Sequence, residues 1–151
     1  MDAQDKHGPI MMNVPDKAPA PLGAYSHAVW AGPFLYLSGQ GARDPVSGKE
    51  VGITLDDNGK VLFYDIEAQV EQVMKNIVNV LEFAGLTVHN LVDVTVFLKN
   101  IADFERFNQI YCQYLGTSAR PARTTVQAAD LPGKNFVEIK AVAYSSKEPQ
   151  P

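Results

Sequence analysis

Two charged residues near the end of the sequence have side chains suited to chemistry, Arg123 and Glu138. An arginine guanidinium is a planar fork of donors that fits a carboxylate and stays charged in any site. A glutamate carboxylate can orient a water molecule and relay protons. Because apolar side chains share the strand faces around them, these charges are expected to be covered, and a covered charge needs a partner or a task. An ion pair on a solvated sheet face is the plainer interpretation of the same two residues.

The segments around these two residues alternate with the period of half-buried strands. In residues 122–128, Arg123 falls on the same side as Thr125 and Gln127. In residues 135–144, Glu138 falls on a side that also carries large apolar residues, namely Phe136, Val142 and Tyr144. A turn signal, Leu131-Pro132-Gly133-Lys134, separates the two segments. The pattern therefore predicts a β-hairpin that brings Arg123 within a step or two of Glu138.

Periodicity and turn residues predict four further strands and two helices. The strands are expected at residues 11–14, 27–31, 34–38 and 91–98, and residues 39–59 form a long loop with a short strand at 51–54. The first helix follows Asp65, its expected N-cap, and ends before Gly85. The second helix opens at Asp103 and ends at Gly116.

These elements predict an α+β layer sandwich, in the order β-β-α-β-α-β-β. Two helices cannot cover both faces of so wide a sheet, so both are expected on one face. The other face would keep Val142, Tyr144 and Phe136, with Phe97 or Val94 and Val96 beside them. Only another subunit would bury such a face. The pattern therefore predicts assembly through that face and a site built between subunits.

Length and composition set the remaining expectations. The 151 residues have the size of one domain, which we expect at 11–146, with a flexible arm at 1–10 and a flexible tail at 147–151. The net charge of −4 argues against a nucleic-acid or anionic-membrane partner. No apolar run approaches a membrane span, and the N-terminus lacks the apolar core of a signal peptide. The single cysteine excludes an intrachain disulfide, so a cytoplasmic location is expected.

The same strands carry a resemblance to a known family. Pro121-Ala122-Arg123-Thr124-Thr125-Val126, followed by Leu131-Pro132 and Val137-Glu138-Ile139, resembles the closing hairpin of the RidA/YjgF family of small trimeric enzymes, best known for hydrolysing imines. The match recurs at residues 23–29, 37–40, 94–98 and 107–111, and covers roughly residues 14–144 in order. Within the family, residues 39–45 and 64–69 look most like the 2-aminomuconate deaminase branch.

The resemblance implies a homotrimer and a role for each matched residue. Arg123 would hold the substrate carboxylate and Glu138 the attacking water, while Tyr25 and Asn108 would line the pocket. Without the resemblance, Tyr25 is as typical of a packed core tyrosine, and Asn108 of a helix-surface asparagine. The implied reaction converts 2-aminomuconate, through its imine tautomer, to 4-oxalocrotonate and ammonia. The alternatives are a general 2-iminobutanoate/2-iminopropanoate deaminase and a non-catalytic ligand-binding module; ribonuclease activity has been attributed to other members.

A longer substrate with two carboxylates would need a second cation beyond Arg123. Arg43, in the loop after Gly39-Gln40, is the favoured candidate, although a solvated loop arginine is its plainer interpretation. Lys140 and Arg120 compete for this role. Lys140 also stands where the family commonly has a second glutamate, as His27 stands where it often has glutamine.

No sequence signal indicates a cofactor or a metal. The zinc-deaminase pattern of His-x-Glu with Pro-Cys-x-x-Cys is absent, and His7, His27 and His89 are too scattered to form a metal site. Gly39-Gln40-Gly41 begins a dinucleotide-type glycine pattern, but no helix opens there. Cys112 lies inside the second helix and is expected to be a small packed residue rather than a nucleophile. The implied deamination is therefore expected to proceed without metal or organic cofactor.

Overall fold

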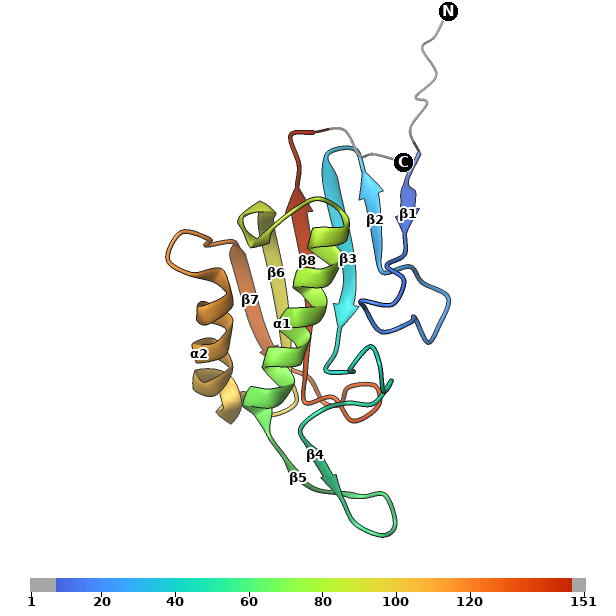
Figure 1. The fold of residues 1–151 in the computed structure, drawn as a ribbon. Coiled ribbons are helices and arrows are strands. Elements are labelled where there is room, and N and C mark those ends of the chain that lie inside the picture. Colours follow the sequence, from blue (N-terminus) through green and yellow to red (C-terminus); the bar gives the residue numbers. More distant parts are fainter. Residues whose placement is uncertain (1–7, 148–151) are drawn as a thin grey trace, which may run out of the picture.

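Two layers make up the fold: a six-stranded sheet, and two helices that lie on the same side of it (Figure 1). A computed structural model describes residues 8–147. The sheet contains β1 (Ile10–Met12), β2 (Ala28–Ala31), β3 (Phe34–Gln40), β6 (Leu91–Leu98), β7 (Ala122–Gln127) and β8 (Val137–Tyr144). The predicted arm and tail fall largely on residues 1–7 and 148–151, which lie outside the described residues.

The helices follow the predicted apolar stripes. Helix α1 (Ile66–Phe83) begins after Asp65, whose side chain accepts a hydrogen bond from the Ala68 N–H as an N-cap. Helix α2 (Phe104–Leu115) follows the short helix η2 (Ile101–Asp103) and ends at Gly116. A second short helix, η1 (Val88–Asn90), leads into β6. No helix within residues 8–147 is long and apolar enough to cross a membrane.

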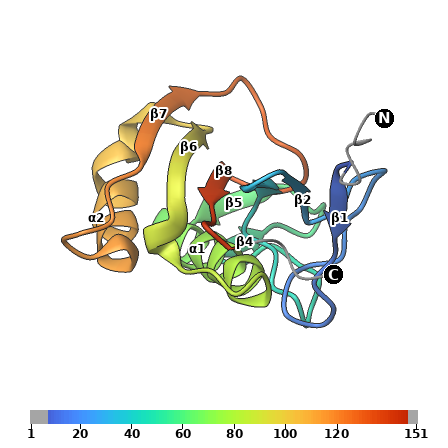
Figure 2. The same cartoon turned by 90° about the horizontal axis from the view of Figure 1, so that it is seen from above.

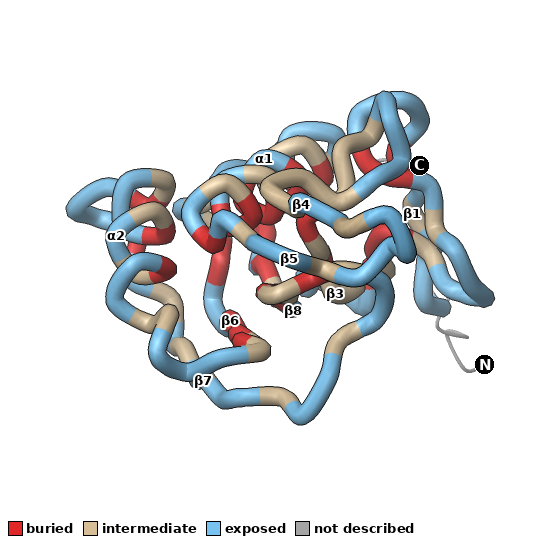
Figure 3. Tube along the Cα trace, turned by 90° about the horizontal axis from the view of Figure 1, so that it is seen from below, coloured by how far each residue is buried: buried red, intermediate tan, exposed pale blue. Residues whose placement is uncertain are grey.

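Strand β8 lies in the middle of the sheet, whose strand order is β1-β2-β3-β8-β6-β7. It pairs antiparallel with β3 on one side and with β6 on the other. Strand β7 lies at the edge and pairs parallel with β6, so α2 is the crossover between two neighbouring parallel strands. The predicted hairpin of residues 122–128 with residues 135–144 is therefore wrong, because β6 separates the two strands. The turn signal belongs instead to a wide connection that passes β6 at the sheet end (Figure 3).

The core fills the space between the sheet and the helices. From α1, Val70, Val73 and Ile77 are buried there; from the sheet, the buried side chains include Leu35, Leu37, Val94, Val96, Ile139 and Ala141. The end-on view shows both helices against one face of the curved sheet (Figure 2). The prediction that both helices cover one face is therefore confirmed, and so is the α+β fold class.

The opposite sheet face is open in the single chain. The aromatic side chains of Phe34, Tyr36 and Tyr144 are 37%, 44% and 43% exposed on it. Val142 and Glu138 share this face, since they alternate with the buried residues of β8. Phe97 also faces this way, because it pairs with Glu138, whereas Val94 and Val96 are buried under the helices.

A small second sheet extends beyond one end of the main sheet (Figure 1). It consists of β4 (Ile53–Leu55), close to the predicted short strand, and β5 (Val61–Tyr64), which the sequence pattern did not indicate. Tyr64 at the end of β5 stacks on Phe136, with ring centroids 3.7 Å apart. Phe136 precedes β8, and its ring packs against Tyr64 and the core. The prediction that Phe136 belongs to the open face is therefore wrong.

Candidate active site

Glu138 lies in a cavity of about 420 Å³ at the end of the main sheet where β3 ends and β8 begins. Three chain segments wall this cavity: residues 19–27, residues 38–50, and the connection that leads into β8. The polar side chains on its wall are those of Tyr25, His27, Ser38, Gln40, Arg43, Glu50, Asn135 and Glu138. Among residues 8–147, no three His, Cys, Asp or Glu side chains are grouped as metal ligands would be.

The carboxylate of Glu138 rests against the backbone of Gly39. The pairing of β3 with β8 shifts register between Leu37 and Gln40, and Gly39 lies in this irregular stretch. A Cβ atom at Gly39 would collide with Oε1 of Glu138, so only glycine leaves room for the carboxylate there. Burial raises the pKa of the Glu138 carboxyl above its ordinary value. A carboxyl group with a raised pKa at a cavity wall is suited to both accepting and returning a proton.

Tyr25 and Arg43 lie on the wall of the same cavity. Tyr25 is 49% exposed, so it is a wall residue and not the packed core tyrosine of the plainer interpretation. Arg43 is half-buried, and its Nη2 donates to the Ala20 carbonyl at 2.7 Å. This bond uses one of the five guanidinium N–H donors, which leaves other donors for a ligand. Arg43 also brings a positive charge to the wall of the cavity that Glu138 lines.

His27, a departure from the family pattern, is a buried structural residue. Its Nδ1 accepts from the Val14 N–H at 2.9 Å, and its Nε2 lies 2.7 Å from the Pro19 carbonyl. A carbonyl only accepts, so Nε2 carries the hydrogen and the ring is neutral in this arrangement. His27 thus ties down the segment that leads to Tyr25.

Arg123 lines a different pocket, of about 360 Å³, between α2 and the start of β7. Its guanidinium lies over the rings of Phe104, Phe107 and Tyr111, at 5.5, 5.7 and 5.0 Å from their centroids. Its Nη1 donates to Oδ1 of Asn108 at 2.7 Å. Aromatic faces and an amide oxygen hold the guanidinium in one orientation. Asn108 therefore has a defined task, unlike the solvated helix-surface asparagine of the plainer interpretation.

The Arg123 pocket also contains an unsatisfied hydroxyl group. The Tyr111 hydroxyl is buried and has no hydrogen-bond partner within residues 8–147. Burial raises the pKa of this hydroxyl, while the charge of Arg123 opposes the shift. Cys112 is exposed on the pocket wall, which contradicts its expected packed position: the apolar stripe of α2 passes through Phe107, Tyr111 and Leu115 instead.

Arg123 and Glu138 do not meet within one chain. Arg123 pairs with Val94 of β6, which pairs with Ala141 of β8, so Arg123 is level with a residue three positions beyond Glu138. Two strand spacings and three residues of rise separate their Cα atoms by roughly 14 Å. Side chains alternate between the two sheet faces, so residues three positions apart point to opposite faces. Glu138 therefore lies on the open face, while Arg123 points toward the rings of α2. The prediction that they are close neighbours is therefore wrong for a single chain.

The competing cations lie elsewhere. Arg120 donates from Nη1 to the carbonyls of Gly116 and Ala119, at 2.6 and 2.7 Å, and so caps the end of α2 beside Arg123. Lys140 is exposed on the open face, two residues beyond Glu138. Only Arg43 of the three lies on the wall of the Glu138 cavity.

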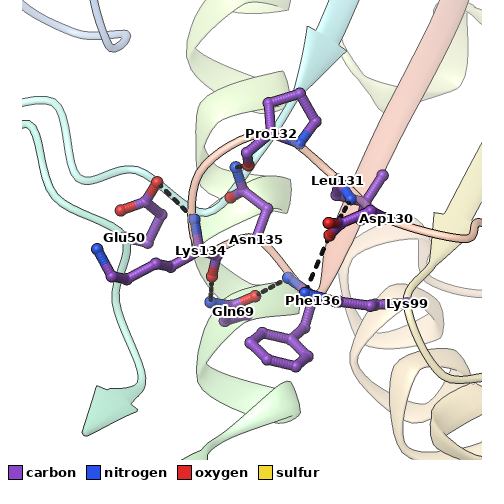
Figure 4. Close-up of polar contacts among 9 residues, drawn as sticks. All are labelled: Glu50, Gln69, Lys99, Asp130, Leu131, Pro132, Lys134, Asn135 and Phe136. Atoms are coloured by element: carbon purple, nitrogen blue, oxygen red, sulfur yellow. Dashed lines mark hydrogen bonds and ion pairs between the residues drawn. The ribbon is translucent and has the colours of Figure 1, made fainter. Parts of the chain in front are cut away.

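Buried amides behind the cavity were not predicted. Gln69 and Asn76 are fully buried on α1, and Asn135 is buried where the connection enters β8. Figure 4 shows Gln69 and Asn135 among the loops they join. Gln69 and Asn76 interrupt the apolar stripe of α1 seven residues apart, on the same side of the helix. Two amide residues within an apolar stripe could have indicated these contacts in the sequence, because buried polar groups need hydrogen-bond partners.

Residues 15–145 match the sequence model of the family described as Endoribonuclease L-PSP. The chain belongs to this family. A RutC family protein of Pyrococcus horikoshii is 39% identical over 129 residues, which cover 85% of this chain and 93% of that protein. Reactive Intermediate Deaminase A of Arabidopsis thaliana, a chloroplastic protein, is 37% identical over 128 residues, 85% of this chain and 62% of that protein.

Solved structures of the L-PSP family share the fold. A Rid family protein of unknown function from Yersinia pestis is 35% identical, with a TM-score of 0.80 over 91% of this chain and 99% of that one. TdcF of E. coli, solved with bound serine, is 28% identical, with a TM-score of 0.75 over 87% of this chain and 95% of that one. The predicted resemblance to the RidA/YjgF group is therefore confirmed, and the family includes proteins named as deaminases.

Proposed function

We propose that this protein is a hydrolytic deaminase of 2-enamino and 2-imino acids, with 2-aminomuconate as substrate and 4-oxalocrotonate and ammonia as products. One observation carries the proposal: Glu138, with its raised pKa, shares a cavity with the cation Arg43. The names of two relatives add support. One is a reactive intermediate deaminase, and the other was solved with serine, whose carboxylate and nitrogen sit on one carbon.

The complete site is proposed to form between copies of the chain in a homotrimer. One chain keeps Arg123 and Glu138 in separate pockets on opposite sheet faces. A neighbouring copy that covers the exposed aromatic face can bring its Arg123 pocket to the Glu138 cavity. The substrate carboxylate would then bind Arg123 of one copy while the reacting carbon faces Glu138 of the next.

The reaction needs two proton relays, and Glu138 can serve in both. Tautomerisation converts the enamine to an imine, whose carbon C2 is attacked by a water molecule held by Glu138. Glu138 takes a proton from this water and passes one to the nitrogen, which gives a carbinolamine. In the second relay the hydroxyl proton moves to the amine, the C–N bond breaks, and ammonia leaves as the C=O bond forms. The net change is C=N plus water to C=O plus ammonia.

Arg43 is proposed to select the longer substrate. 2-Aminomuconate ends in a second carboxylate, whereas 2-iminobutanoate ends in a methyl group. A guanidinium on the wall of the Glu138 cavity can hold that far carboxylate through charge-assisted hydrogen bonds. An Arg43→Ala variant should lose about tenfold to a hundredfold in kcat/KM on 2-aminomuconate and almost nothing on 2-iminobutanoate. Equal losses on both substrates would return Arg43 to the role of a solvated loop residue.

Ammonia release from 2-aminomuconate, compared with release from 2-iminobutanoate, tests the function directly. The purified protein should release ammonia faster from the dicarboxylate, and Glu138→Gln should lower kcat while KM changes little. Faster turnover of 2-iminobutanoate would instead make the protein a general imine deaminase. Binding of either compound without ammonia release would make it a ligand-binding module. The net charge of −4 provides no electrostatic attraction for RNA, so we do not expect the ribonuclease activity that the family description names.

A further inference from the structure

Two loops that are distant in sequence both contribute to the wall of the Glu138 cavity. The first, residues 41–52, follows β3 and carries Arg43; the second, residues 128–136, connects β7 to β8 and ends two residues before Glu138. Behind both loops runs helix α1, which turns the amide side chains of Gln69 and Asn76 toward them; Figure 4 shows the first of these. A helix anchored in the core is a rigid support, so its contacts can set where the loops lie.

Gln69 holds the loop at the Glu138 end. It is fully buried, and its Nε2 donates to the carbonyls of Val51 and Lys134, at 3.1 and 3.0 Å. Its Oε1 accepts from the Phe136 N–H at 2.7 Å. One side chain thus joins both loops and fixes the backbone just before Glu138. In Figure 4 the Gln69 amide points directly at the turn from Lys134 to Phe136.

Asn76 holds the loop at the Arg43 end. It is fully buried two turns further along α1, and its Nδ2 donates to the carbonyls of Gly41 and Arg43, at 3.0 and 2.9 Å. Its Oδ1 accepts from Nε2 of Gln72 at 3.0 Å, which fixes which end of the amide faces the loop. Asn76 therefore holds the backbone of Arg43 itself.

Asn135 couples the two loops directly. Its Oδ1 accepts from the Ala42 N–H at 2.7 Å, and its Nδ2 donates to the Pro132 carbonyl at 2.8 Å. A Cβ atom at Gly41 would collide with this amide, so the loops are in close contact at that point. Glu50 adds a bond from the Lys134 N–H to its Oε1 at 3.1 Å.

We propose that Gln69 and Asn76 are positioning residues for the two charged groups of the cavity, Gln69 for Glu138 and Asn76 for Arg43. This inference rests on the proposed function. Neither amide lines the cavity itself, and each acts through the backbone that it holds. The two residues should therefore control different properties: Gln69 the proton chemistry, and Asn76 the choice between substrates.

Gln69→Met keeps the length of the side chain and removes its hydrogen bonds without adding a charge, and Asn76→Asp keeps size and removes the amide donors. Gln69→Met should loosen the turn before Glu138 and admit water, so kcat should fall at least tenfold on both substrates while their kcat/KM ratio stays constant. Better hydration of Glu138 should also move the acidic limb of the kcat profile to lower pH. The other titratable groups on the cavity wall, Arg43, Glu50, His27 and Tyr25, and Lys140 further along β8, are unchanged in this variant.

Asn76→Asp should have the complementary effect. The preference for 2-aminomuconate over 2-iminobutanoate should fall about tenfold, with the acidic limb unmoved. The matched control is Asn79→Asp, which removes a similar bond from the same helix, Nδ2 to the Lys17 carbonyl at 2.7 Å, and should alter neither property. If Gln69→Met does not fold, Gln69→Asn, which keeps an amide on a shorter side chain, replaces it.

The result that overturns the proposal is a fall in thermal stability in both variants with the acidic limb and the substrate ratio unmoved. An NMR titration of the Glu138 carboxyl separates this failure from failure of the proposed function, because it needs no substrate. If the wild-type protein releases no ammonia, the deaminase proposal fails, yet Gln69→Met should still lower the Glu138 pKa in that titration. An unchanged titration would overturn the positioning role of Gln69 by itself.

Discussion

Mixing two inactive variants provides a direct test of a site shared between copies. Arg123→Ala removes the proposed carboxylate ligand, and Glu138→Gln removes the proposed base. Within one chain these residues lie in separate pockets on opposite sheet faces, so the proposed site takes one residue from each of two copies. A mixed assembly then contains sites in which both wild-type residues meet.

The expected recovery follows from counting neighbours. In a closed ring assembled at random from equal amounts of the two variants, a site is intact when one copy supplies Arg123 and the next supplies Glu138, which happens at about one site in four. Ammonia release should therefore rise to about a quarter of the wild-type rate per chain. The two variants are co-expressed with different affinity tags, and native mass spectrometry verifies that mixed assemblies form.

Activity no greater than the sum of the separate variants, in verified mixed assemblies, would refute the shared site. The control is a mixture of either variant with a double variant that carries both substitutions, which should recover nothing. Recovery in that control would mean that the assay reports something other than the Arg123–Glu138 pair.

Four further outcomes follow from the same geometry. Arg123→Lys keeps the charge but not the planar fork, so kcat/KM should fall on the order of tenfold to a thousandfold, and near-normal steady-state kinetics would remove Arg123 from substrate binding. Gly39→Ala puts a methyl group where the Glu138 carboxylate lies, so turnover should drop without loss of fold; Gly8→Ala, with no atom within 4 Å of the added carbon, is the matched control, and equal rates in both would contradict the contact. Burial raises the pKa of Glu138 in the folded protein, so the folded protein loses stability as pH rises from the ordinary carboxyl pKa through the raised one. Above that pH window Glu138→Gln should melt at a higher temperature than the wild type, and below it the two proteins should melt at the same temperature. Light scattering checks the assembly, where a stable, active monomer at micromolar concentration would exclude the homotrimer.

The helices and the first hairpin could be predicted because their signals are local. The stripe through Val70, Val73 and Ile77 repeats at helical spacing, and Gly32-Pro33 marks the turn between β2 and β3. Each of these patterns involves residues that are neighbours along the chain, so one sequence contains the whole signal.

The strand order could not be predicted in the same way. Strands β7 and β8 have the correct alternation and a turn signal between them, yet β6 from earlier in the chain lies between them. Alternation states which side chains share a face, but it does not state which strand lies alongside. The positions of Arg123 and Glu138 relative to each other depended on that order, so their predicted proximity within one chain was wrong although both strands were right.

The cavity wall shows a similar division. Glu138 and Arg43 were proposed from type and position, whereas Gln69 and Asn76 were passed over as part of a helix pattern. Their partners are backbone groups of loops, and loop paths leave no periodic trace in a sequence. The same holds for β5, whose residues pair with β4 only after a turn that the pattern did not indicate.

The central position of β8 affects how the chain can fold during synthesis. Val137–Tyr144 are translated after every other strand of the main sheet, yet both halves of the sheet pair through them. Until these residues leave the ribosome, β3 and β6 have no common partner, and their apolar faces stay in contact with solvent or chaperones. The chain therefore completes its sheet only after β8 has been translated, in one step that depends on long-range contacts. A stop codon before residue 137 should accordingly abolish the whole sheet, not merely shorten it at one edge.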